Sequence, residues 1–100
     1  MAQVIIAGWM DYAGHRDEVL RLLQRVGAAT LDEAGCLDYS MSADANDDGR
    51  IRVFEHWSSP EALADHLETQ HVKDFRAAIT GFPRVDRRLH RVIVQDVESF

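Results

Sequence analysis

The chain has 100 residues, 46% of them hydrophobic, and a formal net charge of −6. This length suits a single domain over residues 1–100 with a small core. The acidic balance, without a lysine- and arginine-rich block, argues against nucleic acid as a partner. The longest apolar run, 4–10, is far shorter than the roughly 20 residues that cross a bilayer, so we expect a cytoplasmic protein with no membrane partner.

The N-terminal half predicts a strand, a helix and a second strand. Residues 3–12 are dense in apolar, β-prone side chains and predict a strand buried on both faces. Residues 16–33 carry apolar side chains at helical spacing, and Gly35 stands where a left-handed helix cap is common. Residues 36–42 predict the second strand, in which the single cysteine, Cys36, is expected to pack and not to react.

The C-terminal half predicts a hairpin strand over 51–57, a helix over about 59–69, a short helix over 71–80 and a last strand over 89–97. The order β-α-β-β-α-β, with the second helical region broken in two, is typical of a ferredoxin-like α+β fold. Helices cover one face of such a sheet. Because the strands are apolar on both sides, we expect the other face to meet a second copy of the chain in a homodimer.

Residues 44–55 fit the spacing of an EF-hand calcium loop, with Asp44, Asn46, Asp48, Gly49 and Glu55 at ligand or turn positions. The context argues against calcium. A strand-like run precedes the loop, and Pro60 follows too soon for an exiting helix. We favour a polar hairpin turn stabilised by its Asp and Asn side chains, and we expect no metal site.

The most informative segment is 55–76, which reads Glu55-x-Trp57-x-Ser59, then Leu63, His66, Thr69, His71, Phe75 and Arg76. Together with Glu33-x-Gly35-Cys36-x-x-Tyr39, it resembles the antibiotic biosynthesis monooxygenase (ABM) superfamily, especially its quinol monooxygenase branch. The resemblance implies a ferredoxin-like protomer that dimerises sheet to sheet into an α/β barrel. It also implies a cofactor-independent monooxygenase, which oxidises a quinol, phenol or polyketide-like aromatic with molecular oxygen and without metal, flavin or haem.

Such an oxidation needs an apolar pocket, a base and donors for an anion, because a deprotonated phenol or enol gives up an electron to oxygen far more readily. The catalytic candidates are His66, His71, Arg76 and Glu55. His66 and His71 are expected to act as base or donors, provided that a helix break brings them together. Arg76 is expected to hold a phenolate or a superoxide-like species. Glu55 is expected to orient a catalytic histidine or to form a structural ion pair, and it shares its strand face with Trp57.

Five side chains are expected to bind the substrate, namely Trp57, Leu63, Phe75, Tyr39 and Trp9. Trp57 ends its strand beside the helix entry, where it stacks on a flat ring or serves as a core residue. The family's phenol-oxidising branch has a tryptophan at this position and an arginine near Arg76. It has asparagine and tyrosine where this chain carries Val53 and Leu63, which leaves the substrate and the detailed mechanism open.

Two other functions remain open. The first is an isomerase or other acid–base enzyme on a small carbonyl compound, because an isomerase branch of the family resembles the chain at Glu55, His66 and His71. That branch lacks the tryptophan, and phosphate binding would need a basic pocket, whereas the arginines between 84 and 91 predict a solvated loop and strand edge. The second is a non-catalytic binding dimer. Haem degradation is disfavoured, because the first strand has no asparagine.

Overall fold

The computed structural model describes residues 2–100 and contains four strands and three helices. In chain order these are β1 (Gln3–Asp11), α1 (Arg16–Thr30), β2 (Cys36–Ala43), β3 (Arg50–Trp57), α2 (Pro60–Leu67), α3 (Gln70–Ala78) and β4 (Asp86–Val94). The predicted order of elements and the ferredoxin-like α+β fold are confirmed. Within residues 2–100, no helix is long and apolar enough to cross a membrane.

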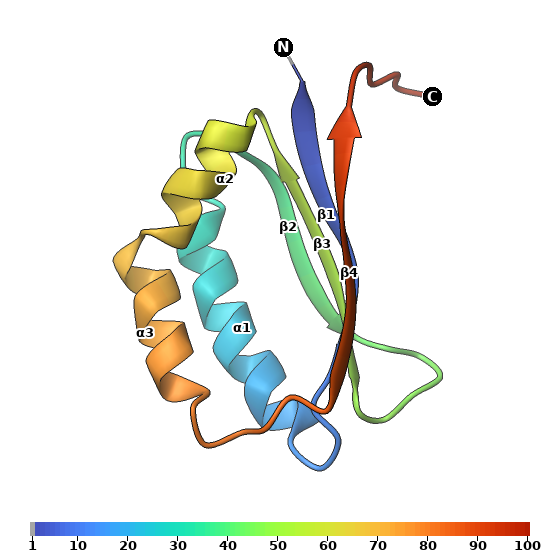
Figure 1. Cartoon of the computed structure of the whole chain (residues 1–100), viewed down its shortest axis with the longest axis vertical. Helices are drawn as coiled ribbons and strands as arrows, with labels where there is room; N and C mark the ends of the chain where they lie inside the picture. The colour runs from blue at the N-terminus through green and yellow to red at the C-terminus, as the bar shows by residue number, and fades with distance from the viewer. Residues whose placement is uncertain (1) are drawn as a thin grey trace.

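The strands form one antiparallel sheet in the order β2-β3-β1-β4. All three helices lie on one face of this sheet, and no helix or strand of residues 2–100 covers the other face (Figure 1). Strand alternation therefore divides the side chains of β1 and β3 into a helix-covered set and an uncovered set. Any pocket between sheet and helices must be built from the helix-covered set.

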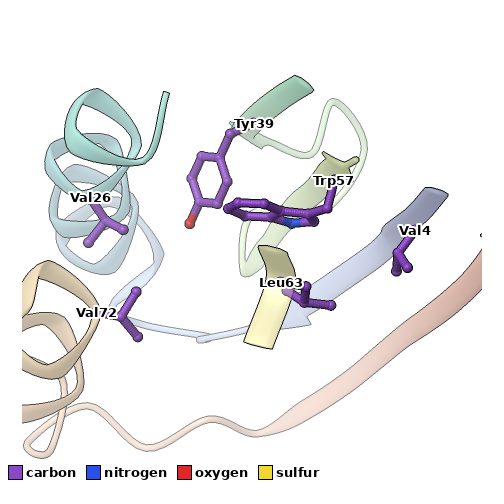
Figure 2. Close-up of a cluster of buried hydrophobic side chains, with 6 residues drawn as sticks. All are labelled: Val4, Val26, Tyr39, Trp57, Leu63 and Val72. Carbon is purple, nitrogen blue, oxygen red and sulfur yellow. The ribbon is translucent and has the colours of Figure 1, made fainter. Parts of the chain in front are cut away.

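The core lies between the helices and the sheet in two clusters. The first, drawn in Figure 2, contains Val4, Val26, Tyr39, Trp57, Leu63 and Val72. The second contains Met10, Tyr12, Val19, Leu23, Ile51 and Val53. Trp57 is the largest fully buried side chain, so the end of β3 anchors the first cluster.

The last strand begins three residues before its predicted start and ends three residues before its predicted end. Pairing with β1 decides this shift, because the ladder runs from Asp86 opposite Asp11 to Val94 opposite Gln3. Val97, predicted to end the strand, therefore lies beyond the last partner on β1. Cross-strand pairing, which no local pattern shows, sets the bounds of this edge strand.

The left-handed cap predicted at Gly35 is wrong. Helix α1 ends at Thr30, earlier than predicted, and positive φ angles occur only at Gly8 and Gly14 among residues 2–100. Glycine is needed at position 35 for a different reason. A Cβ atom there would lie 2.2 Å from Cβ of Ala62, so the glycine lets α2 pack against the backbone that leads into β2.

The loop that fits the calcium pattern is a hairpin turn. The carboxylate of Asp44 accepts hydrogen bonds from the backbone N–H of Asn46 at 2.8 Å and from Nε of Arg52 at 2.7 Å. Asp47 caps the N–H of Gly49 at 2.9 Å. Glu55, the twelfth residue of the pattern, lies within β3. Its distance from the loop along the strand favours the hairpin interpretation over a calcium site.

Candidate functional site

A cavity of about 340 Å³ lies under the helices, against the helix-covered face of the sheet. Most of its walls are apolar, with ionisable groups at intervals along them. The apolar lining includes Leu23, Val26, Val53, Val72, Phe75, Ile79 and Leu89. The charged or titratable lining comprises Tyr12, Tyr39, Glu55, His66, Arg76, Arg84 and Arg87. A largely apolar cleft with a few polar groups is typical of a small-molecule site.

Two imidazoles meet one carboxylate oxygen at the edge of this cavity. Oε2 of Glu33 lies 2.7 Å from Nδ1 of His66 and 2.8 Å from Nε2 of His71. Because α2 ends at Leu67 and α3 starts at Gln70, the histidines belong to separate helices and approach Glu33 from two directions. The predicted helix break is confirmed, and it brings both imidazoles together.

The position of Glu33 defines which nitrogen of His66 is free. A carboxylate only accepts hydrogen bonds, so Nδ1 of His66 carries the hydrogen and Nε2 keeps its lone pair. The imidazole is almost fully buried, at 4% exposure. The Trp57 indole packs on it with 4.6 Å between ring centroids, and Tyr39 lies at 5.8 Å. The ring is therefore fixed in one orientation by packing and by one hydrogen bond.

Glu55 and Trp57 lie on the helix-covered face of β3, as predicted, and contact each other. Nε1 of Trp57 donates to Oε1 of Glu55 over 3.1 Å. Burial raises the pKa of the Glu55 carboxyl, while the Trp57 N–H and His66 act in the opposite direction and Glu33 raises it further. This lining carboxyl accordingly holds a proton to a higher pH than an exposed glutamate does.

Three of the expected substrate contacts do not line the cavity. Trp57 is fully buried and Leu63 is 4% exposed, and both belong to the core cluster of Figure 2. Trp9 lies on the uncovered face of the sheet, because it alternates with the core residue Met10, and the Arg50 guanidinium lies 4.0 Å from its ring centroid. Trp57 supports the site from behind by packing on His66.

The remaining expected residues do reach the site. Tyr39, Phe75 and Arg76 line the cavity together with Glu55 and His66. Burial is the main reason that the pKa of the Tyr39 phenol is raised, so its hydroxyl keeps its hydrogen across the physiological range. His71 contacts Glu33 without lining this cavity.

Two features were missed from the sequence. Glu33 was part of the recognised motif but was assigned to the end of a helix, whereas it lies in the connection between α1 and β2. The arginine run is exposed on a loop and on the edge strand β4, as expected, but Arg84 and Arg87 also line the cavity, which the sequence did not predict. The register supplies the reason, because Arg87 pairs opposite the core residue Met10 and so points to the helix-covered face.

The same cluster has the donor types of a metal site. Ligand atoms of Glu33, His66 and His71 all lie within 4.8 Å of one another, and two imidazoles with one carboxylate suit Zn²⁺ or another divalent transition metal. The contacts of 2.7 and 2.8 Å are hydrogen-bond distances, shorter than the separations between ligands around such an ion. The cluster is thus satisfied as a hydrogen-bonded triad and retains the potential to bind a metal.

Cys36 has the surroundings of a packing residue. Burial raises the pKa of its thiol, and the carboxylates of Glu33, Glu55 and Asp38 raise it further. Thiolate is the reactive form, so these carboxylates suppress nucleophilic chemistry at this position.

A one-sided antiparallel sheet, with a carboxylate and two imidazoles beside an apolar cavity, defines a ferredoxin-like protein with a candidate small-molecule site. The sequence model of the antibiotic biosynthesis monooxygenase family matches residues 4–78, and the chain belongs to this family. No functionally curated protein matches the sequence.

Solved structures agree with this assignment. A candidate antibiotic biosynthesis monooxygenase from Deinococcus radiodurans is 26% identical, with a TM-score of 0.83 and 97% of each chain covered. A candidate of the same kind from Chloroflexus aurantiacus is 23% identical, with a TM-score of 0.82 and 97% of each chain covered. A Bacteroides thetaiotaomicron protein described as a possible oxidoreductase is 18% identical, with a TM-score of 0.81, over 92% of this chain and 97% of that one. The Chloroflexus aurantiacus and Bacteroides thetaiotaomicron structures are only 23% and 18% identical to this chain, so their similarity shows only that the fold is shared.

Proposed function

We propose that the protein is a cofactor-independent monooxygenase that oxidises a small quinol, phenol or polyketide-like aromatic with molecular oxygen. Family membership supports an oxidative role, and the apolar cavity suits a flat hydrophobic molecule. The observation that carries the proposal is the hydrogen bond from Nδ1 of His66 to Glu33, which leaves Nε2 as a base in a cavity-lining residue.

The proposed reaction starts with proton transfer from the substrate hydroxyl to Nε2 of His66. The negative charge of Glu33 stabilises the imidazolium that forms. The substrate anion gives one electron to oxygen, and the resulting radical pair combines to a substrate peroxide. Loss of water leaves a carbonyl, so a C–H group of a phenol plus O₂ becomes a quinone plus H₂O. Arg76, a cavity-lining cation, stabilises the anionic species.

The test is oxygen uptake with a panel of quinols and phenols, under air and under nitrogen. We expect one O₂ consumed per quinone formed, and no product without oxygen. His66→Ala is expected to abolish turnover, whereas Glu61→Gln, a change on the exposed surface of α2, should not. Product formation at the same rate under nitrogen would overturn the oxygenase assignment.

A second candidate is an isomerase or other acid–base enzyme acting on a small carbonyl compound. The observation in its favour is that His66 and His71 share the carboxylate of Glu33, and that His66 lines the cavity together with the carboxyl of Glu55. Proton transfer by such groups requires no oxidant. It is distinguished by turnover without oxygen consumption. A non-catalytic binding protein would bind ligand in the cavity and show no turnover under either condition.

We also propose that the active form is a homodimer joined through the uncovered face of the sheet. Ile5, Ala7 and Trp9 of β1 lie on this face beside Phe54, which is 37% exposed, and Val92, which is 43% exposed. Apolar residues along β1, on a sheet with helices on one side only, favour burial against a second copy. Sedimentation should give a dimer for the native chain and a monomer for Phe54→Asp. A native monomer would contradict the proposal.

A further inference from the structure

Three arginines line the cavity that also contains Glu55 and His66. Arg76 comes from α3, Arg84 from the connection that follows it, and Arg87 from β4. Within residues 2–100, none of the three forms a salt bridge, although acidic residues outnumber basic ones by 17 to 11. All three side chains are exposed, so positive charge gathers without salt-bridge partners at the solvent-facing side of this cavity in an acidic protein.

The sheet register separates Arg87 from the proton-transfer group. Glu55 pairs with Ile6 of β1, whereas Arg87 pairs with Met10 of the same strand. Four residues of β1 correspond to about 13 Å along the strand. Apolar residues, among them Val53 and Leu89, line the space between. The cavity accordingly has one end with an imidazole and a carboxyl, an apolar middle and one end with arginines.

Arg84 acts on a second group at this end. Burial is the larger effect on the Tyr12 hydroxyl and raises its pKa, while the nearby charge of the Arg84 guanidinium acts to lower it. Arg84 and the buried Tyr12 both line the cavity at this end. A planar guanidinium suits a carboxylate or phosphate, because its N–H groups can donate in parallel to two oxygens.

We propose that the substrate carries an anionic group, a carboxylate or a phosphate, which binds to Arg84 and Arg87 while its ring system fills the apolar middle. This inference rests on the proposed function for the identity of the reacting end. With the anion held by the arginines, the opposite end of a rigid two- or three-ring molecule reaches His66 and Glu55. The charge at the arginine end fixes the direction in which the ring system enters.

The proposal is tested by calorimetric binding under nitrogen, so that no turnover is involved. The probes are naphthoate, naphthyl phosphate and the neutral naphthamide, which share one ring system. At least one anion is expected to bind about tenfold or more tightly than naphthamide, and the margin should shrink as ionic strength rises. The better anion identifies the preferred group.

The variant Arg84→Gln/Arg87→Gln should lose this preference and keep its affinity for naphthamide. Arg21→Gln removes an exposed arginine of α1 that does not line the cavity, and it should retain the preference. Equal affinity of the native protein for all three probes would overturn the proposal, as would an equal loss for charged and neutral probes in the double variant. Oxygen uptake is measured in a separate experiment. The two results are therefore independent: the anion site can be confirmed while the oxygenase assignment fails, and the oxygenase assignment can be confirmed while the anion site fails.

Discussion

The carboxylate of Glu33 lies 2.7 Å from Nδ1 of His66, although the two residues are 33 positions apart in the chain. The same oxygen also binds His71, so one side chain holds two imidazoles on separate helices. A carboxylate in this place fixes the ring orientation and stabilises positive charge on it. Glu33 is therefore a positioning residue for the base.

Glu33→Gln should lower kcat about 10- to 100-fold, because the amide keeps the shape but loses the charge that stabilises the imidazolium. KM should change little, since Glu33 does not line the cavity. Steady-state oxygen uptake measures both, and Glu61→Gln serves as the surface control. A rise in KM with unchanged kcat would assign Glu33 to substrate binding instead.

Trp57 is expected to affect stability and not ligand affinity. Trp57→Ala should lower the free energy of unfolding by about 3–5 kcal/mol, because it removes the largest fully buried side chain and leaves a cavity in the core. Trp57→Phe keeps a ring against His66 and removes only the N–H donor to Glu55. Naphthoate affinity of the folded Trp57→Phe protein should match that of the native chain. A clear loss of affinity would mean that the side chain at position 57 contacts the ligand in the cavity.

Glu55 should make stability fall as pH rises. Its pKa is raised in the folded protein, so between the unfolded and folded pKa values the native state binds more protons than the unfolded state does. Glu55→Gln resembles the protonated form and retains an oxygen for the Trp57 N–H. We expect the variant to be more stable than the native chain at pH 7, with the difference vanishing near pH 4. The midpoints of urea unfolding for both proteins between pH 4 and pH 7 measure this difference in stability. A difference that does not change with pH would mean that the titration of Glu55 is not its cause.

The close approach at Gly35 gives a test of how α2 is seated. Gly35→Ala should cost about 1–3 kcal/mol, because the new Cβ would lie 2.2 Å from Cβ of Ala62. Ala62→Gly removes that atom, and alone should cost about 1 kcal/mol as a glycine in a helix. The double variant should lose less unfolding free energy than the two single variants lose when their losses are added. Strictly additive costs would mean that the two positions do not touch.

Zinc provides a test of the paired imidazoles. A chelator-treated protein should keep its oxygen uptake, whereas excess Zn²⁺ should inhibit by binding the donor atoms that lie within 4.8 Å of one another. Glu33→Gln should weaken this inhibition by removing one ligand. Loss of activity on chelation, restored by a metal ion, would replace the cofactor-independent mechanism with a metal-dependent one.

The sequence by itself determined the order of elements and the kinds of residue at the site. Helical spacing, the turn at 46–49 and the Ser59-Pro60 start are local signals, and each marks an element that is present. Alternation along β3 also placed Glu55 and Trp57 on one face. These are interactions between near neighbours in the chain, which a linear pattern records directly.

Only the tertiary structure decided what those residues contact. The depth of the core buries Trp57, the pairing of β4 with β1 turns Arg87 toward the cavity, and the connection after α1 brings Glu33 to two histidines. The reason is physical. Each contact joins segments far apart in the chain, and its geometry depends on the register between strands and on how helices pack across the sheet, neither of which leaves a trace in the local sequence.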